Sequence, residues 1–143
     1  MNEKPAEAHI PLHISMDNPE PMYAQIESQL KDFILADILT PGTRLPSIRA
    51  LASQLSCSVI TTRRVYEDLE REGFVLTRSG RGTVVARIPE EKMAALLREP
   101  VERALREAIG AARRAGLTGE DLHHLLREMM QTEEVKVHQG GTS

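Results

Sequence analysis

The fold is decided by one stretch of the sequence, Pro46–Ala86, which is PSIRALASQLSCSVITTRRVYEDLEREGFVLTRSGRGTVVA. Its first half repeats apolar residues every three or four positions, which is the period of a helix that buries one face. Its second half changes to short β-branched runs on either side of a glycine-containing turn, which is the pattern of a β-hairpin. The stretch therefore predicts two helices followed by a hairpin.

The two predicted helices are joined by a tight turn. Ser47 can cap the first helix with its hydroxyl, and Ser58 can cap the second, which we expect over residues 59–72. Gly73 then ends the second helix as a left-handed cap. Two short helices joined in this way form a helix-turn-helix, which occurs in DNA-binding proteins and in proteins that do not bind DNA. The apolar faces hold Ile48, Leu51, Ala52 and Leu55 in the first helix, and Thr62, Val65, Tyr66 and Leu69 in the second.

The hairpin that follows has a basic tip. Its strands are expected over residues 74–78 and 83–87, and its turn is Ser79-Gly80-Arg81-Gly82. A purely structural hairpin needs no arginine at its tip, whereas an arginine there suits contact with a phosphate backbone. Together with a helix upstream, these elements predict a winged helix-turn-helix domain over residues 20–88.

The upstream helix is expected over residues 22–39, because Pro21 precedes it and Thr40-Pro41-Gly42 stops it. Residues 1–19 are polar and contain prolines, so they are predicted to be a flexible N-terminal segment. The apolar positions of the helix recur on one face, and they are Met22, Ile26, Leu30, Phe33 and Ile34.

Residues 89–131 alternate alanine, leucine and charged residues and predict a helical domain. Pro100 is expected to break or kink a helix there. A last helix is expected over 119–130, with Thr118 and Asp121 as its cap. The polar residues 132–143 are predicted to be a disordered tail. The whole chain is thus predicted to be mainly α with a small β-hairpin.

The apolar faces of the helical domain are too wide for a small monomer to hide. We therefore expect them to pair across a twofold axis in a homodimer. The predicted dimerisation residues are Val101, Leu105, Ala108, Ile109, Leu122, Leu125, Leu126 and Met129.

Charge is distributed unevenly along the chain. The 143 residues carry a net charge of −3, yet residues 44–87 hold eight Arg against four Asp or Glu, a net +4. The flanks are acidic, at −5 for residues 1–43 and −2 for residues 88–143. Local charge sets the field that DNA phosphates meet, so the middle of the chain suits a nucleic acid. On charge alone, an arginine-rich surface without a partner remains an equal alternative.

The amino-acid composition indicates the cellular compartment that we expect for this protein. Aromatic residues make up 3% and Trp is absent, so the core must consist of Leu, Ile, Val, Ala and Met. The single cysteine, Cys57, cannot form an internal disulfide, which favours a reducing compartment. The sequence shows no signal-peptide pattern and no apolar run of about 20 residues that could span a membrane. We therefore expect a cytoplasmic protein with no membrane partner.

Three spaced segments resemble the GntR family of transcription regulators. They are PGTRLPSIRALA at residues 41–52, YEDLEREGF at 66–74 and GRGTVV at 80–85. The resemblance covers about residues 20–87 and implies a bacterial, sequence-specific DNA-binding regulator. The short helical region after it resembles the YtrA-type subfamily, which implies dimerisation through that region. It further implies a homodimeric repressor on a palindromic operator, in a group often associated with transporter operons.

The resemblance also implies which residues contact double-stranded DNA, because the second helix presents its first turn to the major groove. Val59 stands where many family members have a base-reading arginine, and it departs from the family pattern there. Arg64 has an alternative role, an ion pair with Asp68 four residues on. The predicted DNA-contacting residues are Ser47, Arg49, Ser58, Val59, Ile60, Thr61, Arg63, Arg64, Arg78, Gly80, Arg81 and Gly82.

Other kinds of site find little support. Cys57 suits a buried small hydrophobe better than a redox switch. His123 and His124 would point about 100° apart on a helix, which is poor geometry for one metal ion. No catalytic constellation is present, so we expect no enzyme activity, no cofactor and no metal. The alternative function is a winged-helix module for protein interaction that no longer binds DNA, and the sequence identifies no small-molecule effector.

Overall fold

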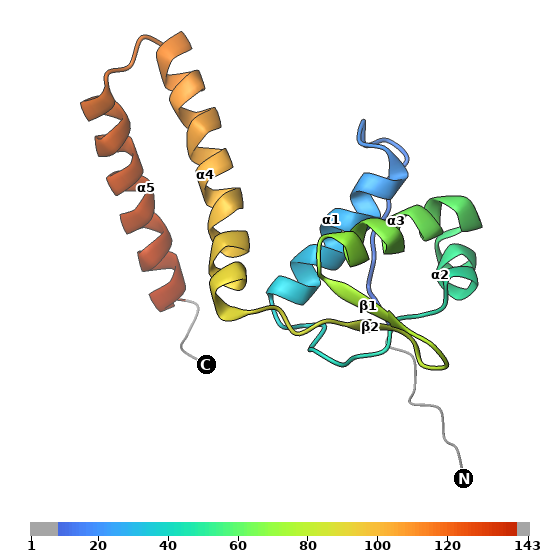
Figure 1. Cartoon of the computed structure of the whole chain (residues 1–143). Helices are drawn as coiled ribbons and strands as arrows, with labels where there is room; N and C mark the ends of the chain where they lie inside the picture. The colour runs from blue at the N-terminus through green and yellow to red at the C-terminus, as the bar shows by residue number, and fades with distance from the viewer. Residues whose placement is uncertain (1–8, 140–143) are drawn as a thin grey trace. The chain divides into compact units, whose positions relative to one another are not determined.

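A computed structural model describes residues 9–139 of the chain, which divide into two compact units between Leu96 and Leu97. The fold is mainly α with one small hairpin, which confirms the predicted class. Along the chain (Figure 1), the elements are α1 (Met22–Leu35), α2 (Ile48–Leu55), α3 (Val59–Arg71), β1 (Val75–Arg78), β2 (Gly82–Val85), α4 (Glu90–Arg114) and α5 (Gly119–Gln139).

Helix α3 is the centre of the first unit, since it packs against α1, α2 and β1. The apolar faces predicted for α1, α2 and α3 supply about half of the core, and residues of the hairpin and of the connecting segments supply the rest. Tyr66 belongs to this core, and its hydroxyl donates a buried hydrogen bond to the carbonyl of Pro46 at 2.7 Å. The fully buried side chains include Ile26, Leu30, Leu51, Val65, Leu69, Phe74, Val75 and Val85.

Both predicted caps of the helix-turn-helix are confirmed. Ser47 Oγ accepts from the N–H of Ala50, and Ser58 Oγ accepts from the N–H of Thr61, each at 3.0 Å. The turn between the two helices depends on Ser56, which has a left-handed backbone with φ of 53°. These contacts fix where α3 begins and therefore which side chains its first turn presents.

The wing contains more than the predicted hairpin. β1 and β2 pair antiparallel, from Val75 opposite Val85 to Arg78 opposite Gly82. Arg44 forms an additional antiparallel bridge with Val84, and the N–H of Leu45 donates to the carbonyl of Thr83 at 2.8 Å. The segment before α2 thus pairs with β2 through an isolated bridge, which the apolar period and the turn residues of the sequence do not predict.

Two expectations about the N-terminal part need correction. Helix α1 ends at Leu35 rather than at residue 39, because Asp37 adopts φ of 59° and the N–H of Ile38 turns back to the carbonyl of Phe33 at 2.9 Å. Of the segment 1–19 that is predicted to be flexible, residues 10–15 pack on the domain, whereas residues 1–8 lie outside the described part. Ile10 is buried, and Gln25 of α1 holds the backbone of Ser15 through both an acceptor and a donor contact of 3.0 Å.

In the helical unit, the structure contradicts the expected helix break at Pro100 and the expected disorder after residue 131, while the alternative of a kink at Pro100 stays a prediction. Helix α4 continues through Pro100, since strong helix formers surround it and only one backbone hydrogen bond is lost at an exposed position. Helix α5 extends to Gln139, because residues 131–139 contain no glycine or proline that would stop it. The predicted tail 132–143 is therefore helical as far as residue 139, and its last four residues lie outside the described part.

The start of α5 agrees with its predicted cap. The N–H of Thr118 donates to Asp121 Oδ2 at 2.9 Å, and the N–H of Asp121 donates to Thr118 Oγ1 at 3.1 Å. These contacts lower the pKa of Asp121, with the backbone hydrogen bond as the larger cause. Within residues 9–139, each helix is either too short or too polar to cross a bilayer.

Candidate nucleic-acid interface

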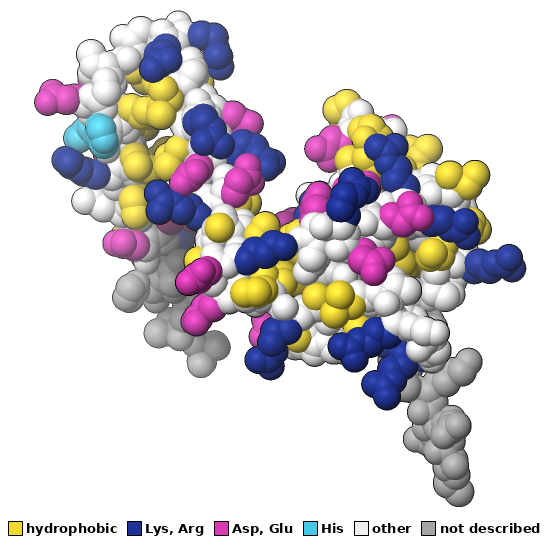
Figure 2. Space-filling model, in the orientation of Figure 1, with side chains coloured by type: hydrophobic (Ala, Val, Ile, Leu, Met, Phe, Trp, Pro, Cys, Tyr) yellow, Lys and Arg dark blue, Asp and Glu magenta, His cyan; other side chains and the backbone are white. Residues whose placement is uncertain are grey.

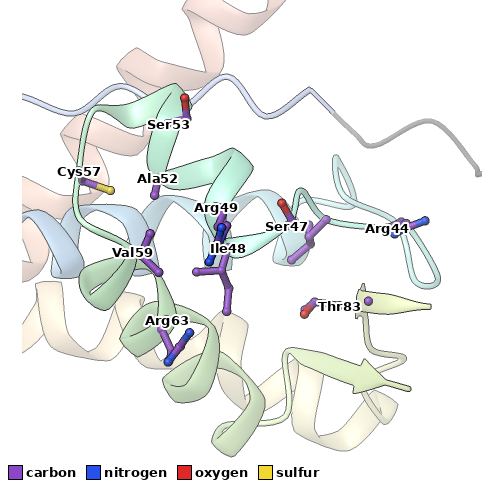
Figure 3. A pocket seen from close by; sticks show the side chains of 12 residues that line it. Arg44, Ser47, Ile48, Arg49, Ala52, Ser53, Cys57, Val59, Arg63 and Thr83 are labelled. Atoms are coloured by element: carbon purple, nitrogen blue, oxygen red, sulfur yellow. The ribbon is translucent and has the colours of Figure 1, made fainter. Parts of the chain in front are cut away.

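A groove of about 900 Å³ opens between α2, the start of α3 and the wing (Figure 3). Each wall comes from a different element, so the tertiary packing of the first unit creates the groove. Its lining residues are Arg44, Leu45, Ser47, Ile48, Arg49, Ala52, Ser53, Cys57, Val59, Arg63, Gly82 and Thr83.

The groove is lined by apolar residues and by positively charged ones. Its three charged lining residues are all arginines, namely Arg44, Arg49 and Arg63. Across the part of the chain that the structure describes, no carboxylate lies within ion-pair distance of these three guanidinium groups. Arginines elsewhere on α3 differ, since Arg64 and Arg71 both contact Asp68. Unpaired arginines gathered around one concave surface suit a polyanion.

The start of α3 adds hydrogen-bond donors to this surface. Ser58 donates from its hydroxyl to Thr61 Oγ1 at 2.8 Å, so the Thr61 hydroxyl keeps its own hydrogen to donate outward. The first backbone N–H groups of a helix also carry partial positive charge. Hydroxyls and helix N-termini are common partners of phosphate oxygens.

The predicted contact residues fall into three groups, only one of which lines the groove, and their contact with DNA stays a prediction. Ser47, Arg49, Val59, Arg63 and Gly82 line the groove itself. Four more lie on the first turns of α3 or at its cap, and three lie on the wing. These seven are Ser58, Ile60, Thr61, Arg64, Arg78, Gly80 and Arg81.

Arg64 adopts its alternative role, the ion pair within α3. Its Nε lies 3.8 Å from Asp68 Oδ2, and its guanidinium stacks over the ring of Tyr23, with 3.7 Å from the Arg64 Cζ to the ring centroid. Tyr23 belongs to α1, so Arg64 links α3 to α1 in the free chain. Arg63, the residue before it, lines the groove instead.

Arg44 is the residue that sequence reasoning missed. It forms the isolated bridge beside β2, and its guanidinium approaches Gly82, where an added Cβ would contact its Nε at 3.5 Å. Gly82 also has φ of 73°, a conformation that favours glycine. The available signal was the alternation of Arg44 with the buried Leu45, which places Arg44 on the outer face of an extended segment.

A carboxyl pair lies between α1 and α3. Glu27 of α1 lies next to Asp68 of α3, and Glu27 Oε1 is buried with no hydrogen-bond partner among the described residues. Burial chiefly, and then the contact with Asp68, raise the pKa of Glu27 to about 7. This pair lies beside Arg64 and forms part of the packing that orients α3.

The other candidate site residues are Cys57, His123 and His124, and each contacts a residue that is close to it in the sequence. Cys57 is half-buried, and its Sγ lies 3.2 Å from the Thr62 hydroxyl. His123 contacts the carbonyl of Gly119 at 2.7 Å, while His124 lies 3.1 Å from Glu128. Within residues 9–139, no group of three or more His, Cys, Asp or Glu side chains is arranged to hold a metal ion.

Comparison with known proteins identifies relatives over most of the chain. Residues 22–85 match the description "Bacterial regulatory proteins, gntR family". The HTH-type transcriptional repressor YtrA of Bacillus subtilis is 32% identical over 118 residues, which cover 82% of this chain and 91% of the repressor. The HTH-type transcriptional regulator Rv1152 of Mycobacterium tuberculosis is 36% identical over 110 residues, which cover 77% of this chain and 86% of that regulator.

A solved structure agrees with these relatives. It is described as YtrA from Sulfolobus acidocaldarius, a GntR-family transcription factor, and it is 36% identical to this chain. The match covers 66% of this chain and 97% of that one, with a TM-score of 0.53. The match with the Bacillus subtilis repressor is longer than the domain of residues 22–85, so the similarity extends beyond that domain.

Proposed function

Because the chain belongs to the GntR family of bacterial regulatory proteins, we propose that it is a homodimeric transcriptional repressor that binds a palindromic operator in double-stranded DNA. The observation that carries this proposal is the groove with Arg44, Arg49 and Arg63, three arginines that have no carboxylate partner within residues 9–139. Arg49 and Arg63 are exposed and Arg44 is half-buried, so all three guanidinium groups can reach an anionic partner. A duplex supplies regularly spaced phosphates to all of them at once.

The wing and α3 have separate tasks on the duplex. The first turn of α3 enters the major groove, where an arginine fork reads guanine O6 and N7. In this arrangement, Arg63 of α3 and Arg49 of α2 face the major groove of the DNA. Arg78 and Arg81 of the wing contact phosphates or the minor groove, and most of these contacts give affinity rather than sequence preference.

The second unit supplies the dimer. Its helices expose large apolar side chains along one stripe each, with 41–59% of each residue's surface exposed, and hydrophobic side chains are visible along both helices in Figure 2. A twofold axis that pairs these stripes removes them from water and doubles the DNA-binding surface. The stripes consist of Val101, Leu105 and Ile109 on α4 and of Leu125, Leu126 and Met129 on α5. Repression is the activity of the named relative from Bacillus subtilis, and control of a transporter operon is proposed from the subfamily resemblance.

The proposal is tested by selecting bound sequences from random duplex DNA with the full chain. We expect a palindrome whose half-sites lie about one helical turn apart. Affinity for that operator is then measured by fluorescence anisotropy at several salt concentrations. Arg49→Ala and Arg63→Ala should each cost about 1–3 kcal/mol if the arginine reads a base, and removal of an arginine that binds a phosphate should reduce the salt slope by about 0.9.

Arg103→Ala is the matched control, because Arg103 is also an exposed helical arginine but pairs with Glu99 in the second unit. It should leave affinity and salt slope unchanged. A folded wild-type chain with no salt-dependent affinity for any duplex would contradict the proposal. It would favour the alternative of a winged-helix module for protein interaction.

A further inference from the structure

Ile60 exposes a large apolar side chain to water, which is unfavourable. It lies on the first turn of α3 with 82% of its surface exposed. Packing does not account for it, because α3 buries its Val65 and Leu69 on the opposite side. Helix propensity does not account for it either, since β-branched residues are weaker helix formers than alanine or leucine.

The surroundings of Ile60 are those of the DNA-facing surface. The preceding residue, Val59, is 39% exposed and lines the groove. Arg63 is three residues further on, and residues spaced in this way share one side of a helix. Ser58 and Thr61 flank it with hydroxyl groups. Two adjacent apolar side chains therefore begin the helix among groups that suit phosphates and polar base edges.

An apolar side chain at this position needs an apolar partner in the major groove. Most of the base edge that is exposed there consists of hydrogen-bond donors and acceptors, and the distinctive apolar group is the 5-methyl of thymine. Contact between Ile60 and that methyl group would remove both from water. Contact with a guanine or cytosine edge would leave polar atoms facing a side chain that cannot pair with them.

We propose that Ile60 is a specificity-determining residue that recognises the 5-methyl group of one thymine in each operator half-site. The proposal rests on the proposed function, since it requires the first turn of α3 to enter the major groove. Loss of one buried methyl group corresponds to about fourfold in affinity, and loss of one in each half-site to about fifteenfold. Val59, the preceding residue, provides a second apolar side chain on the groove side.

The experiment replaces thymine by deoxyuridine in the selected operator, which removes the 5-methyl group and keeps base pairing. Each thymine position is substituted symmetrically in both half-sites, and affinity for the full chain is measured by anisotropy. For the wild type, we expect one position to weaken binding by about fifteenfold. For Ile60→Ala, the same substitution should have no effect, because the methyl group has lost its partner.

Ile38→Ala is the matched control, because Ile38 is also strongly exposed, at 62%, but lies after α1 and outside the groove. It should keep the full response to deoxyuridine. Ile60→Val serves as a graded second variant and should keep part of the response. Circular dichroism melting is expected to be unchanged for all three variants, since the substituted side chains are exposed.

The inference is overturned if no thymine position responds in the wild type, or if Ile60→Ala keeps the wild-type response. Both results would leave salt-dependent binding of the unmodified operator intact, so they would refute the role of Ile60 and not DNA binding. Absence of binding to the unmodified operator is a different outcome. It would refute the proposed function and this inference together.

Discussion

Arg63 and Arg64 are neighbours in the sequence with different surroundings. Arg63 lines the groove, whereas Arg64 stacks on Tyr23 and lies near Asp68. The difference follows from the helix, because successive residues point about 100° apart. One arginine therefore remains available to a ligand while the next stabilises the contact between α1 and α3. Residue type alone does not separate these two roles.

Glu27 gives a prediction at the same scale. Its pKa is raised to about 7, so the folded chain binds a proton that the unfolded chain releases near pH 4.5. The folding free energy contributed by this group is therefore largest below pH 4.5 and is lost as pH rises towards 7. Glu27→Gln keeps a neutral amide that can donate to Asp68. We expect the melting temperature of Glu27→Gln to rise relative to that of the wild type between pH 5 and pH 8.

Glu67→Gln is the control for that comparison, since Glu67 is an exposed carboxylate on the same helix as Asp68. Its melting temperature should follow that of wild type over the same pH range. Parallel curves for Glu27→Gln and wild type would show that Glu27 is ionised throughout and would contradict the raised pKa.

Helix ends are the feature that matters at the scale of elements. Gly73 ends α3 with φ of 84°, and an added Cβ would lie 2.6 Å from Lys92 Nζ. The same Nζ donates to the carbonyl of Glu72 at 2.6 Å, so the lysine side chain cannot move without breaking that hydrogen bond. We expect Gly73→Ala to destabilise the domain by about 1–2 kcal/mol in urea unfolding, which is the cost of a left-handed non-glycine residue.

Gly119→Ala is the matched substitution at a helix start. Nothing lies within 4 Å of the added Cβ, and the backbone there has no positive φ. Alanine should therefore be neutral or slightly stabilising, because it favours the helix more than glycine does. Equal losses of stability in both variants would show that the effect comes from glycine removal in general and not from the geometry at Gly73.

At the scale of the whole molecule, the exposed stripes of α4 and α5 predict the oligomeric state. Leu105→Asp and Leu125→Asp each place a charge in the proposed dimer interface, where desolvation is costly. We expect the wild type to sediment as a dimer and both variants as monomers. Operator affinity should fall sharply in the variants, because two linked half-sites bind far more tightly than one.

Ile38→Asp is the control, since it adds the same charge at an exposed apolar residue of the first unit. It should remain dimeric and keep its operator affinity. A wild-type chain that sediments as a monomer at micromolar concentration would contradict the dimer, although each winged domain could still bind a single half-site.

Much of this chain follows from the sequence by itself. Local rules place both caps of the helix-turn-helix, the left-handed Gly73 and the cap at Thr118, because each depends on residues within a few positions of one another. The apolar period identifies the buried face of α3 for the same reason. The segments that resemble the GntR family contain several of these caps and turns, so the family too could be predicted from the sequence.

The groove was decided only by tertiary structure. Arg44 lies beside Gly82 because a segment before α2 pairs with β2, and nothing local in the sequence indicates that long-range pairing. The packing of residues 10–15 against the first unit likewise depends on the assembled core. The pairing of Glu27 with Asp68 across two helices does so too. Local rules describe residues that are close along the chain, whereas the charged surface that meets a ligand is built from residues that only folding brings together.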